Sequence, residues 1–202
     1  RMIAAVWLLL PILTGVTAQP LPVGVTIRHD QLRAIADDYW EFYLRENPET
    51  GTSLGEYQNN SKLTDYSLAH VVVVRQQATE LLRRAQAVDV TGLADSDRLD
   101  QQLLVRLLTD QLESIRLKNY EMPIDQFNGV HILLPRIATV APFDTVAHYR
   151  DYMARLNAIP LALDQVIERS RAGVKDGLMQ PRFLLEETIA QCAALADAPG
   201  AS

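Results

Sequence analysis

The chain has 202 residues, of which 48% are hydrophobic and 22% are charged, and its formal net charge is −6. This length and composition suit one domain of moderate size with a hydrophobic core and argue against wholesale disorder. Only three lysines occur and the arginines are scattered, so the chain lacks the clustered positive charge that binds phosphates. We therefore expect no nucleic-acid partner.

Hydrophobic spacing predicts a mostly α fold of antiparallel helices. Apolar residues recur at steps of three and four, with caps such as Ser67 and Asp30 at the expected helix starts. The helices are expected at about 30–46, 67–87, 96–118, 144–158, 160–175 and 181–196. The expected apolar stripe of the helix over 96–118 consists of Leu99, Leu103, Leu107, Leu112 and Ile115. Proline and glycine between 119 and 142 predict an irregular segment, with a short strand or buried extended piece at 130–134.

The N-terminal segment 1–18 is expected to be a signal peptide. Residues 2–18 carry no charge, and the small side chains of Val16 and Ala18 fit a signal-peptidase site. The apolar run is short for a bilayer span, which needs about 20 apolar residues. We expect an exported protein, periplasmic or extracellular, with no stable membrane anchor after cleavage. An uncleaved N-terminal anchor is the alternative.

The remaining domain boundaries follow from composition. The polar stretch 19–28 is expected to be a linker, and 29–196 an incomplete domain in the form of a helical lobe. The proline- and glycine-containing end, 197–202, is expected to be a further linker stub.

Few residues carry recognisable chemistry. Cys192 is the single cysteine, so the chain has no internal disulfide bond and no thiolate zinc site. None of the four histidines belongs to a zincin motif, and no nucleophile-elbow or phosphate-loop motif occurs. Asp144 and His148 could face one metal ion from a helix, but Asp144 is better explained as a helix N-cap. We expect no catalytic residue and no metal ligand in this chain.

Several short motifs follow one another in a fixed order. They are Pro48 to Gly55, Leu63 to Ser67, Asp97 to Leu104, and Met122 to Gly129. This ordered set, which covers roughly residues 35–195, resembles the N-terminal portion of the family catalogued as domain of unknown function 885. Members of that family are exported, largely helical and considerably longer proteins that resemble zinc metallopeptidases.

The resemblance implies a role for this chain within a larger protein. The zinc-binding helix of the family lies later in the chain and has no counterpart here, so no catalytic or metal residue is carried over. The resemblance implies an N-terminal lobe that supplies scaffold and one wall of a substrate cleft. Its partners would be the remainder of its own chain and a peptide substrate. Zinc would be the cofactor of the full-length protein, with no cofactor in this chain.

The irregular segment supplies the substrate-cleft candidates, Asn128, Gly129 and His131. Irregular segments held on a rigid scaffold tend to carry sites, and a loop histidine can bind a ligand or act as a base. The alternatives are a buried turn at Asn128 and Gly129 and a hydrogen-bonded structural histidine. For the whole protein, the alternatives to a peptide hydrolase are a non-catalytic helical binding or structural module, and a complete protein that ends at Ser202.

Overall fold

A computed structural model describes residues 23–197, and this part of the chain is helical without β-strands, which confirms the mostly α prediction. The elements are α1 (Val23–Glu46), α2 (Pro48–Ser53), α3 (Leu68–Ala87), α4 (Asp95–Arg116), the 3-10 helix η1 (Asn119–Glu121), α5 (Val130–Val140), α6 (Val146–Asp176) and α7 (Arg182–Ala196). The expected signal peptide 1–18, the start of the linker 19–28 and nearly all of the stub 197–202 lie outside the described residues.

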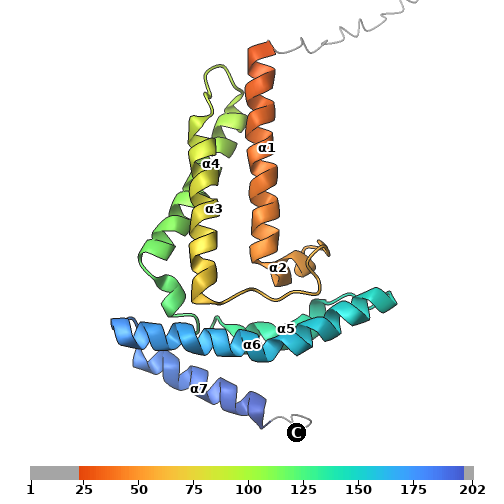
Figure 1. Cartoon of the computed structure of the whole chain (residues 1–202), viewed down its shortest axis with the longest axis vertical. Coiled ribbons are helices and arrows are strands. Elements are labelled where there is room, and N and C mark those ends of the chain that lie inside the picture. Colours follow the sequence, from red (N-terminus) through yellow and green to blue (C-terminus); the bar gives the residue numbers. More distant parts are fainter. Residues whose placement is uncertain (1–22, 198–202) are drawn as a thin grey trace, which may run out of the picture.

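The helices form an upright group and a crossing group (Figure 1). Helices α1, α3 and α4 stand side by side and run antiparallel in sequence, and α2 lies at the foot of α1. Helices α5 and α6 run across beneath them, and α7 lies below α6. Between residues 23 and 197, no helix is both long and apolar enough to span a bilayer.

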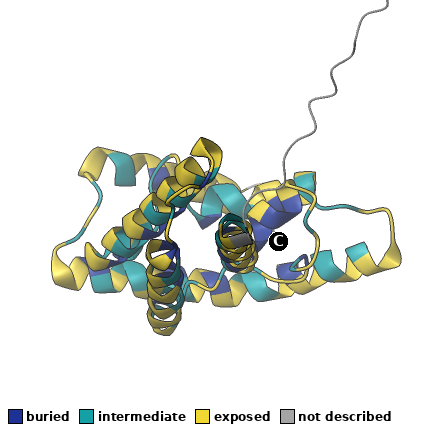
Figure 2. Ribbon diagram, turned by 90° about the horizontal axis from the view of Figure 1, so that it is seen from above, coloured by how far each residue is buried: buried dark blue, intermediate teal, exposed yellow. Residues whose placement is uncertain are grey.

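The core lies between the three upright helices. Its buried members are Leu32, Ile35, Phe42, Ala78, Leu81, Ala85, Val88, Leu104 and Leu108. Leu108 is fully buried, whereas many residues on the outer sides of the helices are exposed (Figure 2). Each fully buried leucine of this kind contributes about 2 kcal/mol through the loss of apolar surface from water. The core therefore fixes the angle between α1, α3 and α4.

Helix α1 begins earlier than predicted. It starts at Val23, so Asp30 is not its N-cap, and the part of the expected linker from Val23 onward is helical. Arg28 explains the difference, because its guanidinium donates to Asp89 at 3.2 Å and to the Thr91 carbonyl at 2.7 Å. These contacts tie the first turns of α1 to the α3–α4 connection, which no local pattern reveals.

The predicted helix starts were partly right. The Ser67 side chain accepts from the His70 backbone N–H at 3.2 Å, which confirms this N-cap. The expected cap Asp144 is wrong, since Thr145 caps α6 by accepting from the His148 N–H. Thr145 has the extended backbone that an N-cap needs, and its hydroxyl reaches the third N–H of the helix.

Two prolines lie inside helices instead of breaking them. Pro135 lies within α5, so the expected strand or extended piece at 130–134 is wrong. Pro160 lies within α6, which is one helix of 31 residues and not two. A helix-interior proline costs about 3 kcal/mol. Burial of Ile137 in α5 and of Ala162 and Val166 in α6 offsets that penalty.

A buried arginine holds the connection between α2 and α3 against α6. Arg155 is 1% exposed, and its guanidinium donates to the carbonyl oxygens of Lys62 at 2.8 Å and Pro48 at 3.0 Å. Glu49, which is also buried, accepts from the Thr64 N–H at 2.9 Å and from its hydroxyl at 2.7 Å. These bonds satisfy backbone groups of an irregular segment and place it beside the ends of α1 and α3.

Candidate functional site

One carboxylate closes the predicted turn at 122–129. Asp125 Oδ1 accepts from the backbone N–H groups of Phe127 at 2.7 Å and Asn128 at 2.9 Å. The Asn128 side-chain Nδ2 lies 3.3 Å from Asp125 Oδ2, and the Asn128 backbone carbonyl accepts from the Asp125 backbone N–H. The hydrogen bond from Phe127, followed by those from Asn128, holds the pKa of Asp125 below its ordinary value. Asn128 is thus held inside the turn, while Phe127 at the tip is 73% exposed.

Gly129 occupies a backbone conformation that favours glycine. It precedes α5 with φ of 137°, and a Cβ there would lie 2.7 Å from Ile124 Cγ2 and 3.0 Å from His131 Nδ1. Any side chain would therefore clash as well as strain the backbone. The missing side chain lets the turn fold closely onto the start of α5.

Gln191 of α7 fixes the tautomer of His131. The Gln191 amide nitrogen donates to the Gln126 carbonyl at 3.1 Å, so its Oε1 is left to accept from His131 Nε2 at 3.0 Å. The proton of the neutral ring therefore lies on Nε2, and Nδ1 is buried without a hydrogen-bond partner among the described residues. The structure brings Asn128, Gly129 and His131 together, with His131 beneath the turn and Phe127 at its surface.

Three leucines of the expected apolar stripe lie at the surface of α4. Leu99, Leu103 and Leu107 are 54%, 52% and 50% exposed, and we call them the leucine row. They are exposed because α1 and α3 pack against the neighbouring face of α4. That face contributes Leu104, Leu108 and Ile115 to the buried set.

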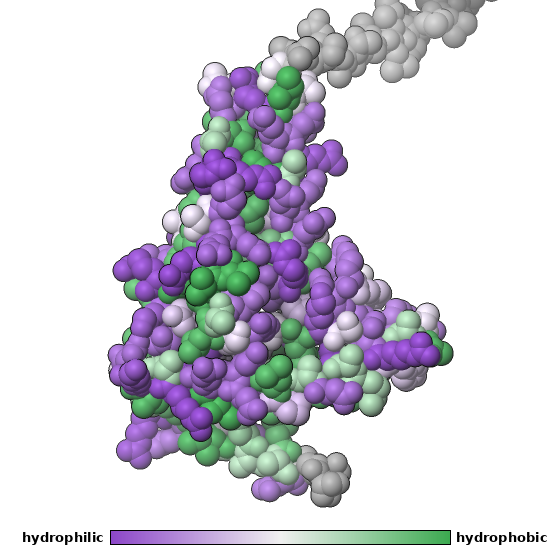
Figure 3. Space-filling model, viewed as in Figure 1, coloured by the Kyte–Doolittle hydropathy of each residue, from purple (hydrophilic) through white to green (hydrophobic). Residues whose placement is uncertain are grey.

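Leu103 and Leu107 of the leucine row line an open groove between α1 and α4. The groove has a volume of about 450 Å³, and its other lining residues are Leu32, Leu104 and Ala36 with His29, Arg33, Asp97 and Asp100 at the rim. His29 Nδ1 lies 3.0 Å from Asp97 Oδ2 and links the two helices. Hydrophobic surface also shows along the upright helices and near α6 and α7 (Figure 3). An apolar strip with a charged rim has the composition of a protein–protein interface.

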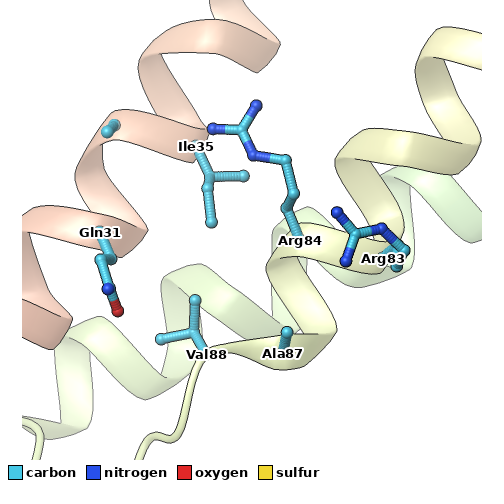
Figure 4. Close-up of a pocket in the computed structure, with 7 residues that line it drawn as sticks. Gln31, Ile35, Arg83, Arg84, Ala87 and Val88 are labelled. Carbon is cyan, nitrogen blue, oxygen red and sulfur yellow. The ribbon is translucent and has the colours of Figure 1, made fainter.

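A second groove, of about 360 Å³, lies between α1 and α3 (Figure 4). Two arginines border it together with Gln31, Ile35 and Val88. Arg84 forms an ion pair with Asp38 at 2.7 Å, and Arg83 forms one with Glu80 at 2.6 Å. Because both guanidinium groups already have a carboxylate partner, this groove offers no unpaired charge to a ligand.

Sequence reasoning missed an ionisable cluster where α1 ends and α3 begins. His70 Nε2 lies 2.5 Å from Glu46 Oε2, and His70 Nδ1 lies 3.7 Å from Asp65 Oδ2. Desolvation alone would raise the pKa of Asp65, but hydrogen bonds from Ser67 and Gln165 and the charge of His70 hold it below its ordinary value. Glu46 lies 24 residues before His70, on another helix, so no local spacing joins it to the other two. The only signal was Asp65, within the 63–67 motif.

The described residues do not fit a zinc ion. A zinc site needs three or four converging His, Cys, Asp or Glu side chains, and residues 23–197 contain no group with that arrangement. His148, which was considered as a ligand beside Asp144, packs edge-on against Tyr57 with ring centroids 5.5 Å apart. No catalytic step through a metal follows from these residues.

The fold and its surfaces define a helical lobe that combines a rigid, tethered turn with an outward-facing apolar row. The profile of the family described as "Bacterial protein of unknown function (DUF885)" matches residues 48–202. This match covers most of the chain, so the chain belongs to that family. The match begins at Pro48, the first residue of the motif Pro48 to Gly55. A search of curated proteins finds no match.

Proposed function

We propose that the chain is the N-terminal helical lobe of an exported peptide hydrolase of the zinc-metallopeptidase kind. In this proposal the lobe supplies scaffold and one wall of the substrate cleft, and another part of the same protein supplies zinc ligands and catalysis. The observation that carries it is the leucine row, which lies uncovered beside the α1–α4 groove. Covering the exposed half of each leucine would stabilise the assembly by about 1 kcal/mol per residue.

The turn at 122–129 is the part of the lobe that we assign to the cleft wall. Phe127 at its tip is exposed, and the turn is held from both sides by Asp125 and by the Gln191 bond to Gln126. A binding surface works best when its supporting residues are locked in this way. Asn128 and Gly129 would shape this wall, and His131 would support it from beneath.

A non-catalytic helical binding module is the second candidate function. The α1–α4 groove favours it as well, since an apolar strip with His29, Arg33 and Asp100 at its rim suits a separate protein partner. The two functions differ in what covers the leucine row. In the hydrolase it is another part of the same polypeptide, and in the binding module it is a different molecule.

The coding sequence after the Ser202 codon separates the two candidates. The hydrolase requires the reading frame to continue into a helix that carries a His-Glu pair and further histidines. A stop codon directly after Ser202, or a continuation without such a helix, would remove the hydrolase and leave the binding module. Export is tested separately, by determining the N-terminal residue of the protein recovered outside the cytosol. An N-terminus at Gln19 supports it.

A further inference from the structure

Arg169 of α6 is held rigidly and has no carboxylate partner. Its Nε donates to the Tyr66 carbonyl oxygen, and its Cζ lies 5.4 Å from the centroid of the Tyr66 ring and 5.8 Å from that of Tyr120. Within residues 23–197, no carboxylate oxygen lies within 4.0 Å of its guanidinium nitrogens. The Nη nitrogens are therefore free to donate, while two rings and one carbonyl fix the plane of the guanidinium.

The guanidinium borders a small cavity where five elements meet. The cavity has a volume of about 190 Å³, which is room for a ligand of a few heavy atoms. Its walls carry the uncharged polar side chains of Asn47, Thr64, Gln111 and Tyr120, and its apolar side consists of Val71, Val74 and Ile115. Polar groups at fixed positions above an apolar side are the usual composition of a small-molecule site.

Four ionisable groups face this cavity besides Tyr120, namely Glu46, Asp65, His70 and Arg169. Glu46 is already paired, since its two oxygens lie 3.3 Å from Arg45 Nε and 2.5 Å from His70 Nε2. Asp65 Oδ1 already accepts from the Ser67 N–H at 2.8 Å and from the Gln165 amide at 2.9 Å. Its Oδ2 lies 3.7 Å from His70 Nδ1 and the side chain is 46% exposed, so Oδ2 is the oxygen left for a ligand. The cavity therefore offers one cation and one partly free carboxylate, separated by more than 4.0 Å.

We propose that this cavity binds a small ligand in which a carboxylate lies next to a nitrogen donor, such as an α-amino acid or the C-terminal residue of a peptide. The ligand carboxylate accepts from the Nη nitrogens of Arg169, whose planar fork matches a carboxylate. The ligand ammonium or amide N–H points toward Asp65. A dianion such as phosphate is disfavoured, because the negative charges of Glu46 and Asp65 repel it. This inference does not depend on hydrolysis by the whole protein.

The first test compares four probes by titration calorimetry on the full chain at neutral pH. L-alanine and L-alanyl-L-alanine carry the carboxylate, and whichever binds more tightly identifies the source. L-alaninamide lacks the carboxylate, and inorganic phosphate supplies an anion of the wrong charge. We expect both to bind about tenfold or more weakly than the better of the first two, as the loss of a charge-assisted bidentate contact predicts. Equal binding of L-alaninamide or phosphate, or no binding of either carboxylate probe, would overturn the proposal.

The second test changes the cation. Arg169→Gln should weaken binding of the better probe by about tenfold or more, and Arg169→Lys should also weaken it, since the ammonium keeps the charge without the fork. Arg171→Gln is the matched control, because Arg171 is exposed on the same helix. Circular dichroism establishes that each variant is folded. If Arg169→Gln unfolds, Arg169→Lys and the comparison with L-alaninamide decide the matter. Unchanged binding in folded Arg169→Lys would contradict the assignment.

Discussion

Gly173 of α6 and Glu121 of η1 are in direct backbone contact. A Cβ on Gly173 would lie 2.4 Å from the Glu121 carbonyl oxygen and 2.7 Å from that of Leu178. The contact joins the end of α4 to the crossing helix, and it buries Glu121, which is 5% exposed and lies 3.4 Å from Lys118 Nζ. Only glycine permits this approach, because the neighbouring atoms belong to the backbone and cannot turn away.

Gly173→Ala should therefore destabilise the fold. Forcing a methyl group against two carbonyl oxygens has an overpacking penalty of about 2 kcal/mol. Gly24→Ala is the matched control, since Gly24 lies in α1 with nothing within 4 Å of its added Cβ. Alanine should leave stability there unchanged or raise it by up to about 1 kcal/mol through helix propensity. Urea unfolding measures both, and equal losses in the two variants would contradict the close contact.

Leu107 and Leu108 are neighbours with opposite environments. Leu108→Ala should lower the free energy of unfolding by about 3 kcal/mol, because it leaves a cavity in the core between α1, α3 and α4. Leu107→Ala should change it by less than about 1 kcal/mol in the isolated chain, since Leu107 is 50% exposed. If urea unfolding gave comparable losses of stability for Leu107→Ala and Leu108→Ala, α4 would have to present a different face to α1 and α3.

Replacing Arg155 should lower the free energy of unfolding more than replacing any exposed arginine of α6. Arg155→Met removes the donors to the Lys62 and Pro48 carbonyls and should lower the free energy of unfolding by about 3 kcal/mol. Limited proteolysis should then cut within 54–67, because this segment loses its attachment to α6. The exposed Arg150→Met is the control and should remain resistant. Resistance of Arg155→Met would mean that Glu49 alone holds the segment.

Asp65 should make stability depend on pH at the acid end. Its folded pKa lies below the unfolded value of about 4, so its stabilising contribution is present above that value and is lost as the pH falls through the folded pKa. Asp65→Asn should be less stable than the wild type at neutral pH, and the difference should shrink on acidification below about pH 4. Urea midpoints across the acid range measure this. A difference that grows on acidification would contradict the sign.

The leucine row gives a direct labelling experiment. In a Cys192→Ser background, Leu103→Cys and Thr109→Cys place one thiol each on different sides of α4, and both exposed positions should react quickly with a thiol reagent in the isolated chain. In the complete gene product, Leu103→Cys should react about tenfold or more slowly, because the contacts that cover the row, worth about 1 kcal/mol per leucine, must be undone for access. Thr109→Cys should stay fast. Fast labelling at both positions would mean that nothing covers the row.

Local rules predicted most of the helices but not their ends. The Ser67 cap and the last helix after Pro181 followed from side chains next to their own helix termini. The early start of α1 depends on Arg28 reaching Asp89, and the unbroken α6 depends on burial of Ala162 and Val166 around Pro160. Such contacts join residues far apart in sequence, so propensity and spacing do not contain them.

The candidate site residues also divide into those with a local sequence pattern and those brought together only by the fold. Asn128 and Gly129 were recognised as turn residues because such residues carry a local signature, and the structure places Asp125 and Ile124 beside them. Arg169 and His70 had no signature, because Tyr66, Glu46 and Tyr120 reach them from separate elements. The leucine row was recognised as an apolar stripe, but periodicity gives a helix an apolar face without saying which neighbour covers it.

Peptide hydrolysis by the complete gene product tests the central proposal most directly. The protein should be purified with its bound metal and assayed on a mixture of short peptides before and after removal of zinc by a chelator. We predict cleavage that is lost with the zinc and restored when zinc is returned, while this chain alone neither binds zinc nor cleaves. No cleavage by a folded, zinc-replete product, or cleavage by this chain alone, would contradict the assignment of this lobe as scaffold and cleft wall.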